Sequence, residues 1–228
     1  MIEESIFRRL RHKLGNYEER ITKPRGKRVF LNSLPQKAVL LDVGCGNHSP
    51  ENIKRLRPDI YYAGIDVADY NTDEVSKSAA DKYILTTGED FADAISGLDI
   101  QFDAAISSHN LEHCDHPFET LDAICGRLRG GGRLYLAFPC EKSVFFPSRA
   151  GTLNFYDDET HSNLPELAAV MKNLVQKNRM FIDFVSASYK PLIAHCLGIV
   201  SDFFIRDRNT RYTWPHYGFE TIIWAHKK

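Results

Sequence analysis

Residues 39–50, VLLDVGCGNHSP, decide how this 228-residue chain is expected to fold. A short apolar run meets the acid Asp42, and two glycines, Gly44 and Gly46, follow it one residue apart. The apolar run is typical of a buried strand, and Pro50 suits the first turn of a helix. Glycines at the end of a strand allow positive φ angles and let a ligand approach the backbone closely. The stretch therefore predicts a strand, a ligand-binding loop and a helix.

Segments typical of strands and helices alternate along the following part of the chain. Strands are predicted at residues 37–43, 61–66, 82–86, 102–108 and 133–138, and helices at 50–57 and 117–128, the second stopped by the glycine run 130–132. The rhythm is looser afterwards, with a helix following Pro165, a strand at 181–186, a helix at 191–205 and a last strand at 220–225. Such alternation implies right-handed crossovers and parallel strands. We expect an α/β fold: a doubly wound, mostly parallel, seven-stranded Rossmann-like sheet with helices on both faces and an elaborated C-terminal third.

Length and composition indicate a single domain over residues 1–228. We expect a helical cap at 1–30, a cofactor-binding core at 37–140 and an acceptor-side region at 141–228. A formal net charge of −1 argues against a nucleic-acid partner. The longest uncharged run, residues 191–201, is too short for a membrane span of about 20 residues. Five cysteines without a CxxC pair suit a reducing compartment, so a cytoplasmic location is expected.

A second acid, Asp66, ends the next predicted strand twenty residues after Gly46. In sheets of this kind a carboxylate at that place can accept hydrogen bonds from both ribose hydroxyls of a nucleotide cofactor. NAD, FAD and S-adenosylmethionine all fit this far. A dinucleotide loop has a third glycine three residues after the second, where this chain has Ser49. The charge of Asp42 also suits an ammonium and a sulfonium better than a diphosphate, which favours S-adenosylmethionine.

Three motifs in order carry a family resemblance: LLDVGCG at 40–46, GID at 64–66, and SSHNLEH at 107–113 followed by GGGRLYLAFP at 130–139. Over residues 37–140 the chain resembles the class I S-adenosylmethionine-dependent methyltransferases, in the branch with a DxGCG first motif. The resemblance implies S-adenosyl-L-methionine as cofactor. It implies these contacts to the cofactor: Asp42, Gly44 and Gly46 at the methionine end, Asp66 at the ribose, Glu89 or Asp90 at the adenine amine, and Ser108 and His109 beside the methyl group.

The segment 107–116, SSHNLEHCDH, is dense in groups that bind metals or move protons. His109 and His113 are four residues apart, and with Glu112 and His116 they can imitate a metal site. The family resemblance instead places the segment over the transferred methyl group and implies no metal. A hydroxyl acceptor must lose a proton, and histidine suits that task. His109 and His113 are therefore the candidate catalytic bases, and we expect no metal.

The methyl acceptor is expected to be a small molecule bound by residues that follow the core. The Asn/Asp-Pro-Pro-aromatic motif of nucleic-acid amino-methyltransferases does not follow the fourth predicted strand. Two predicted loops, 145–161 and 211–217, mix aromatic rings with polar groups, which suits a hydroxyl of a sugar, glycan or lipid precursor. The candidate acceptor-binding residues are Arg149, Tyr156, His161 and Trp214. A non-catalytic binding protein of the same fold and a nicotinamide-dependent oxidoreductase are the alternatives.

Overall fold

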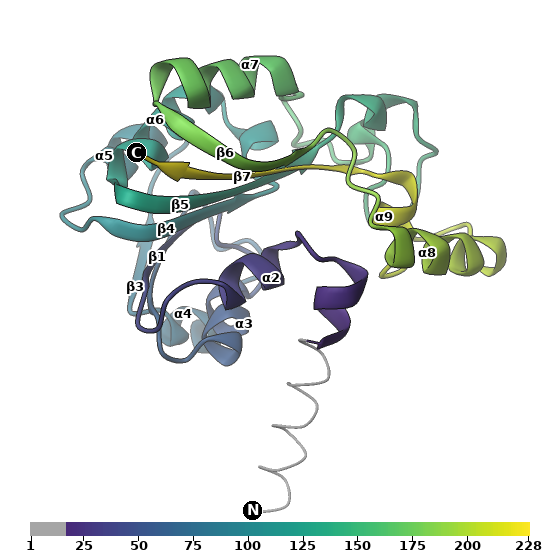
Figure 1. The fold of residues 1–228 in the computed structure, drawn as a ribbon, viewed down its shortest axis with the longest axis horizontal. Coiled ribbons are helices and arrows are strands. Elements are labelled where there is room, and N and C mark those ends of the chain that lie inside the picture. Colours follow the sequence, from purple (N-terminus) through teal and green to yellow (C-terminus); the bar gives the residue numbers. More distant parts are fainter. Residues whose placement is uncertain (1–16) are drawn as a thin grey trace, which may run out of the picture.

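A seven-stranded sheet forms the centre of the computed structural model, which describes residues 17–228 (Figure 1). The strand order is β3-β2-β1-β4-β5-β7-β6. All neighbouring strands from β3 to β5 pair in parallel, whereas β7 is antiparallel to both β5 and β6. The predicted fold class is thus confirmed. The strands are β1 (Val39–Val43), β2 (Tyr61–Asp66), β3 (Lys82–Leu85), β4 (Phe102–Ser108), β5 (Leu128–Pro139), β6 (Met180–Ser186) and β7 (Glu220–Lys227).

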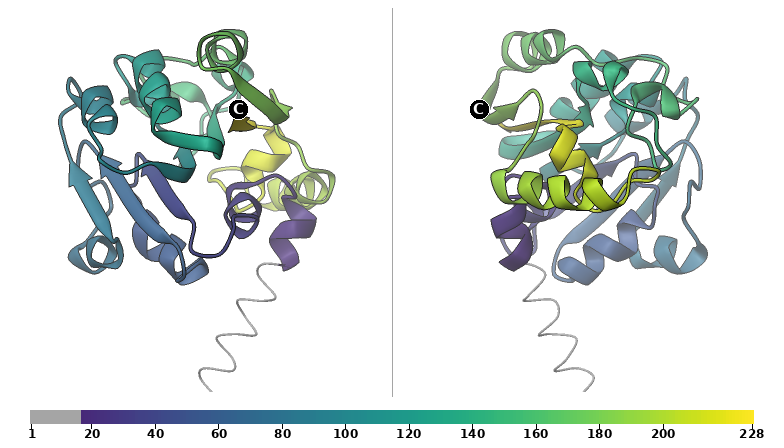
Figure 2. Two further views of the ribbon diagram at one scale, coloured as in Figure 1. Left: turned by 60° about the vertical axis from the view of Figure 1, so that its left-hand side comes forward. Right: turned by 90° about the vertical axis from the view of Figure 1, so that its right-hand side faces the viewer.

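Helices cover both faces of the sheet (Figures 1 and 2). One face carries α5 (Phe91–Ser96), α6 (Pro117–Arg127) and α7 (Leu167–Lys172), and the other carries α2 (Lys27–Asn32), α3 (Ser49–Leu56) and α4 (Glu74–Ala79). Beyond the carboxyl ends of the parallel strands, α8 (Leu192–Phe204) packs against α9 (Thr213–Tyr217). The predicted cap at 1–30 lies partly outside the described residues.

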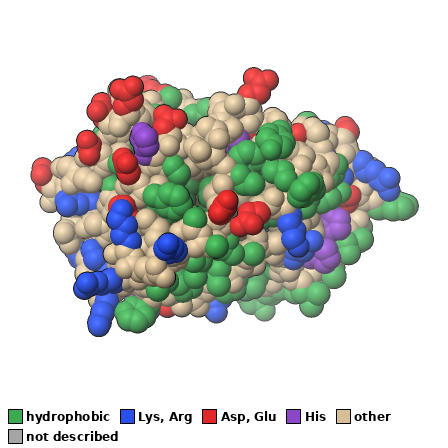
Figure 3. All heavy atoms as spheres, turned by 90° about the horizontal axis from the view of Figure 1, so that it is seen from above, with side chains coloured by type: hydrophobic (Ala, Val, Ile, Leu, Met, Phe, Trp, Pro, Cys, Tyr) green, Lys and Arg blue, Asp and Glu red, His purple; other side chains and the backbone are tan. Residues whose placement is uncertain are grey.

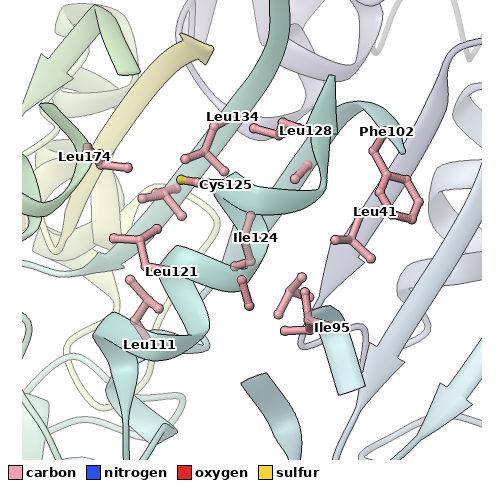
Figure 4. Close-up of a cluster of buried hydrophobic side chains, with 14 of the residues drawn as sticks. Leu41, Ile95, Phe102, Leu111, Leu121, Ile124, Cys125, Leu128, Leu134 and Leu174 are labelled. Carbon is pink, nitrogen blue, oxygen red and sulfur yellow. The ribbon is translucent and has the colours of Figure 1, made fainter. Parts of the chain in front are cut away.

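Neighbouring residues of each central strand enter opposite halves of the core. In β1, Leu41 packs with Phe102 and Ile124 on the side of α5 and α6, as Figure 4 shows. Leu40 instead packs with Phe30 and Tyr62 on the side of α2 and α3. Because both faces of these strands are buried, they appear in the sequence as continuous apolar runs rather than as alternating ones.

The structure corrects the prediction for β5 and adds short helices. β5 begins at Leu128 instead of 133, so the glycine run 130–132 lies within the strand instead of before it. The extra residues fit because the pairing with β4 shifts register between Phe102 and Ala104. Three short helices, α4, α5 and α9, have five or six residues each and were not predicted. Elements this short carry too little periodicity to be recognised.

The surface of α8 is unusually apolar. Leu192, Phe203 and Phe204 each expose more than two thirds of their area. Apolar side chains accordingly reach the surface at the end of the molecule that carries α8, at the right of Figure 3. Among the described residues, none of the helices combines the length and the apolar character that crossing a membrane requires.

Candidate active site

A cavity of about 570 Å³ lies at the carboxyl ends of β1, β2 and β4. The strand order reverses between β1 and β4, and ligands of open α/β sheets bind at such a point. One wall of the cavity is formed by the loops that follow these three strands. The opposite wall comes from the C-terminal third, with Thr152, Asp158, His161 and Trp214. The volume falls within the range of small-molecule sites, about 300–1,000 Å³.

The loop after β1 has glycines at two places where a side chain would clash with a neighbouring segment. Gly44 has a φ of +75°, and a Cβ atom there would lie 2.6 Å from the side-chain oxygen of Asn110. A Cβ atom on Gly46 would lie 2.8 Å from the carbonyl oxygen of Tyr70. Both glycines border the cavity, as expected of residues that line the cofactor.

Asp66 is the last residue of β2, borders the cavity and holds the glycine loop by a hydrogen bond. Its Oδ2 accepts the N–H of Gly46 at 2.8 Å, and its Oδ1 accepts the N–H of Val67 at 2.7 Å. Each oxygen retains acceptor capacity, which suits two ribose hydroxyls. Burial raises the pKa of Asp66, and the backbone hydrogen bonds offset only part of that effect.

Asp42 lies beneath the loop rather than at the cavity wall. Its Oδ2 accepts hydrogen bonds from the hydroxyls of Ser49 and Tyr62, each at 2.6 Å. Burial raises the pKa of Asp42, and the nearby charge of Lys27 and these hydrogen bonds offset it only in part. Asp42 does not border the cavity, so the expected direct contact with the methionine end is replaced by a role in holding the loop.

Ser108, at the end of β4, borders this cavity and a second one of about 370 Å³. The second cavity shares the glycine loop and extends along Lys27 and Arg28 of α2. A cationic wall beside the loop suits the carboxylate of a methionine moiety. The first cavity therefore has a carboxylate suited to the ribose of S-adenosylmethionine, and the second has cationic side chains suited to its methionine carboxylate.

The two acids proposed for the adenine amine have different positions. Asp90 precedes α5 and accepts a hydrogen bond from the hydroxyl of Thr87 at 2.7 Å. Glu89 borders a small cavity of about 80 Å³, which also includes Val67 of the main cavity wall. Of the two, Glu89 is therefore the better candidate, and its role remains a prediction.

His109 is held between two carboxylates. Its Nδ1 lies 3.1 Å from Glu112 Oε1 and its Nε2 lies 3.2 Å from Glu220 Oε1. Burial alone would lower the pKa of His109, but the hydrogen bonds to both acids outweigh it and raise the pKa to about 9. The ring is therefore protonated at neutral pH, where it donates from both nitrogens and is unsuited to accept another proton.

The backbone and the neighbouring rings fix the position of His109. It has a φ of +55°, which is uncommon for a residue with a side chain, and its N–H donates to the carbonyl of Ala137 at 2.8 Å. The ring lies 4.7 Å from that of Trp214 and stacks on that of Phe219 at 5.9 Å. Strained backbone of this kind gathers at functional sites.

His113 and His161 meet at the other side of the cavity. Their ring centres are 4.8 Å apart, although the residues are separated by 48 positions. His113 is exposed and its Nδ1 lies 3.2 Å from the carbonyl of Thr160. The side chain of His161 is nearly buried, with its Nδ1 2.6 Å from the carbonyl of Phe155. Both histidines border the cavity, and their predicted roles, a base for His113 and acceptor binding for His161, stay predictions.

The remaining acceptor candidates divide into one that borders the cavity and two that do not. Trp214 borders it and donates its indole N–H to the carbonyl of Thr152 at 2.7 Å. Arg149 is 9% exposed and forms an ion pair with Asp202 of α8. Tyr156 is 73% exposed and projects elsewhere. Arg149 thus joins segments of the C-terminal third, and neither residue is placed to touch an acceptor in the cavity.

Several residues that border the cavity were not predicted from the sequence. Asp158 and Thr160 lie within a stretch that was considered, but nothing in their pattern separated them from exposed loop residues. Thr152 reaches the cavity through a positive φ of 60°, which its residue type does not indicate. Phe219 follows Gly218, and its apolar pattern indicates a core residue. It is indeed buried, but the pattern does not indicate that it also borders the cavity. None of these residues has a local signal that identifies it.

Comparisons with known proteins identify the family. A family model described as a methyltransferase domain matches residues 10–178, well over half of the chain. No curated protein sequence gives a significant match. The glycine loop, Asp66 and the cavity volume fit S-adenosyl-L-methionine, which is the cofactor.

Solved structures share the fold at low identity. A structure of the Haloferax volcanii Trm112 methyltransferase activator with its methyltransferase is 15% identical, with a TM-score of 0.60 over 95% of this chain and 93% of that one. A Mesorhizobium loti S-adenosylmethionine-dependent methyltransferase is 14% identical, with a TM-score of 0.57 over 87% and 96%. The Burkholderia thailandensis 1,6-didemethyltoxoflavin-N1-methyltransferase, solved with S-adenosylhomocysteine, is 15% identical, with a TM-score of 0.54 over 93% and 80%. The match to the family model and the shared fold together show that this chain belongs to the methyltransferase domain family, among the class I S-adenosylmethionine-dependent methyltransferases.

Proposed function

We propose that this protein transfers the methyl group of S-adenosylmethionine to a hydroxyl of a small molecule such as a sugar, a glycan or a lipid precursor. One observation carries the proposal. The same cavity has the glycine loop and Asp66 on one wall and a wall of aromatic and polar side chains on the other. The cofactor and an acceptor can therefore meet in one cavity.

The chemistry requires mainly alignment. A lone pair of the acceptor oxygen forms a bond to the methyl carbon, while the electrons of the carbon–sulfur bond return to sulfur and leave S-adenosylhomocysteine. Holding two reactants in line can contribute about 7–11 kcal/mol to lowering the barrier. The glycine loop and Asp66 would fix the cofactor, and the opposite wall would fix the acceptor.

The opposite wall has the composition of a polyol site. Trp214 offers an aromatic face for C–H groups, supported by the buried ring of Phe219, and Asp158 and Thr160 offer partners for hydroxyls. Asp158 and Thr160 take over the role that we assigned from the sequence to Arg149 and Tyr156. His161 and Trp214 keep that role.

Removal of the acceptor proton falls to His113 rather than His109. A protonated ring held by two carboxylates cannot take a further proton, whereas His113 faces the cavity with its Nδ1 against a backbone carbonyl. His109 then acts by position, next to the methyl group and against Trp214.

A two-stage experiment tests the proposal. Calorimetry with S-adenosylhomocysteine should first show saturable binding at one site. Release of S-adenosylhomocysteine from S-adenosylmethionine is then measured over a panel of sugars, nucleotide sugars, amines and thiols. Hydroxyl acceptors should give turnover. Binding without turnover on any acceptor would favour the non-catalytic alternative, and turnover on amines or thiols alone would refute the hydroxyl assignment.

A further inference from the structure

We propose that Glu112, His113 and His161 form a binding site for a divalent transition-metal cation at the acceptor side of the cavity. One potential ligand atom from each residue lies within 4.8 Å of the other two. Glu112 and His113 belong to the 3₁₀ helix η1 (Leu111–His113), while His161 follows η3 (Phe155–Asp157). The family resemblance of the sequence implied no metal, because it places residues 107–116 over the transferred methyl group; the metal-site alternative considered there did not include His161.

Glu112 provides the first argument. Its side chain is completely buried, and Oε1 lies against His109. Within the described residues, Oε2 has no hydrogen-bond partner. A buried acceptor left without a partner destabilises the folded state, and more so when it is charged. One carboxylate oxygen of Glu112 lies within 4.8 Å of a ring nitrogen of each histidine, and its buried, unpartnered Oε2 leaves acceptor capacity that suits a cation.

The two histidines provide the second argument. Histidines that bind metals usually donate their other ring N–H to a carbonyl or a carboxylate, which fixes the orientation of the ring. His113 and His161 both have Nδ1 against a backbone carbonyl, that of Thr160 and that of Phe155. Within residues 17–228, neither Nε2 makes a hydrogen bond. Each ring is thus oriented with one nitrogen engaged and the other available.

The donor set selects the kind of cation. Two imidazoles and one carboxylate suit Zn²⁺ and related first-row divalent ions, whereas Mg²⁺ and Ca²⁺ prefer oxygen ligands throughout. Asp158 adds a nearby oxygen, with Oδ2 3.9 Å from His161 Nε2. Ligands about 2.1 Å from one ion lie roughly 3–4 Å from each other, so binding requires modest side-chain rotation. His113 is exposed, so a small adjustment of its ring meets little packing resistance.

The cation would define the acceptor further, and this step rests on the proposed function. Three protein ligands leave coordination positions open toward the cavity. An acceptor hydroxyl bound there would be more acidic, so its O–H bond would break with the proton passing to water. The oxygen keeps the electron pair and uses it to form the bond to the methyl carbon. His113 then promotes deprotonation as a ligand, and acceptors with two adjacent oxygens, such as vicinal diols, are favoured because they chelate.

Metal binding is measured on the full chain after treatment with EDTA and desalting. Titration calorimetry with Zn²⁺ and absorption spectra with Co²⁺ should show one site per chain. His113→Ala and Glu112→Gln should each weaken binding about tenfold or more, since even outer partners of metal ligands contribute that much. The matched control is His116→Ala, an exposed histidine of the same segment outside the cluster.

The outcomes are distinct. Absence of stoichiometric binding in the wild type, or equal loss in the His116→Ala control, overturns the metal site. His113→Ala decides the question if Glu112→Gln does not fold, because His113 is exposed. Affinity for S-adenosylhomocysteine is measured on the same samples and should not change in any variant. A wild type that binds S-adenosylhomocysteine but no metal therefore refutes only this site, whereas a wild type that binds no S-adenosylhomocysteine refutes the proposed function.

Discussion

Replacing Asp66 with asparagine is expected to weaken cofactor binding about 10- to 150-fold. The carboxylate accepts one backbone N–H on each oxygen, at 2.7 and 2.8 Å, and keeps acceptor capacity for the ribose. Hydrogen bonds to a charged group contribute about 1.5–3 kcal/mol, and each 1.4 kcal/mol is tenfold in affinity. The side-chain NH2 of asparagine would also face one of the two backbone N–H groups, and two donors cannot form a hydrogen bond. Calorimetry with S-adenosylhomocysteine measures the change, with Asp69→Asn, an exposed acid outside the cavity, as control.

Two further measurements show whether Asp66 contacts the ribose itself. An analogue of S-adenosylhomocysteine without the ribose 2′-hydroxyl should bind the wild type more weakly, and Asp66→Asn should lose little more on that analogue. If the loss of affinity from the missing hydroxyl and the loss from Asp66→Asn simply add, a direct contact between Asp66 and the ribose is refuted. Because burial raises the pKa of Asp66, wild-type affinity should fall as pH decreases through that raised value, and Asp66→Asn should lack this dependence. A large drop in Tm with unchanged affinity would mean that Asp66 only holds the loop.

Three other changes test the site and its surroundings. Gly46→Ala places a methyl group 2.8 Å from a backbone carbonyl. Overpacking of this kind costs about 1–3 kcal/mol and displaces the loop, so cofactor affinity should fall in calorimetry. Gly126→Ala, with no atom within 4 Å, should leave the affinity unchanged. Trp214→Leu should raise the acceptor KM roughly 2- to 10-fold, since an aromatic face that packs against the acceptor contributes about 0.5–1.5 kcal/mol, while exposed Tyr156→Ala should leave KM unchanged. Arg149→Ala leaves a carboxylate of α8 unpaired, so Tm in a thermal melt should fall by several degrees, about 2–4 °C per kcal/mol, without a change in KM. An increased KM for Arg149→Ala would contradict its structural role.

The sequence by itself determined the fold class and the positions of the central strands, and it predicted the loop that holds the cofactor. β4 lies at the predicted residues 102–108, and β1 and β2 end at the predicted Val43 and Asp66. These features are local: a buried strand needs an apolar run, and a close approach of ligand to backbone needs glycine. Gly44 and Gly46 therefore predicted a ligand-binding loop without knowledge of the residues that pack against it. The short helices were missed because five or six residues contain less than two turns of a repeating pattern.

Only the tertiary structure decided what the polar side chains do. His109 was predicted as a base, but Glu220, 111 residues further on, joins Glu112 around it and favours the protonated ring. Arg149 was predicted to bind the acceptor, but its ion pair with Asp202 takes it out of the cavity. The properties of an ionisable group depend on its burial and on the charges within a few ångströms. Residue type and spacing do not contain that information, because the neighbours of a loop residue are set by the packing of segments distant in the chain.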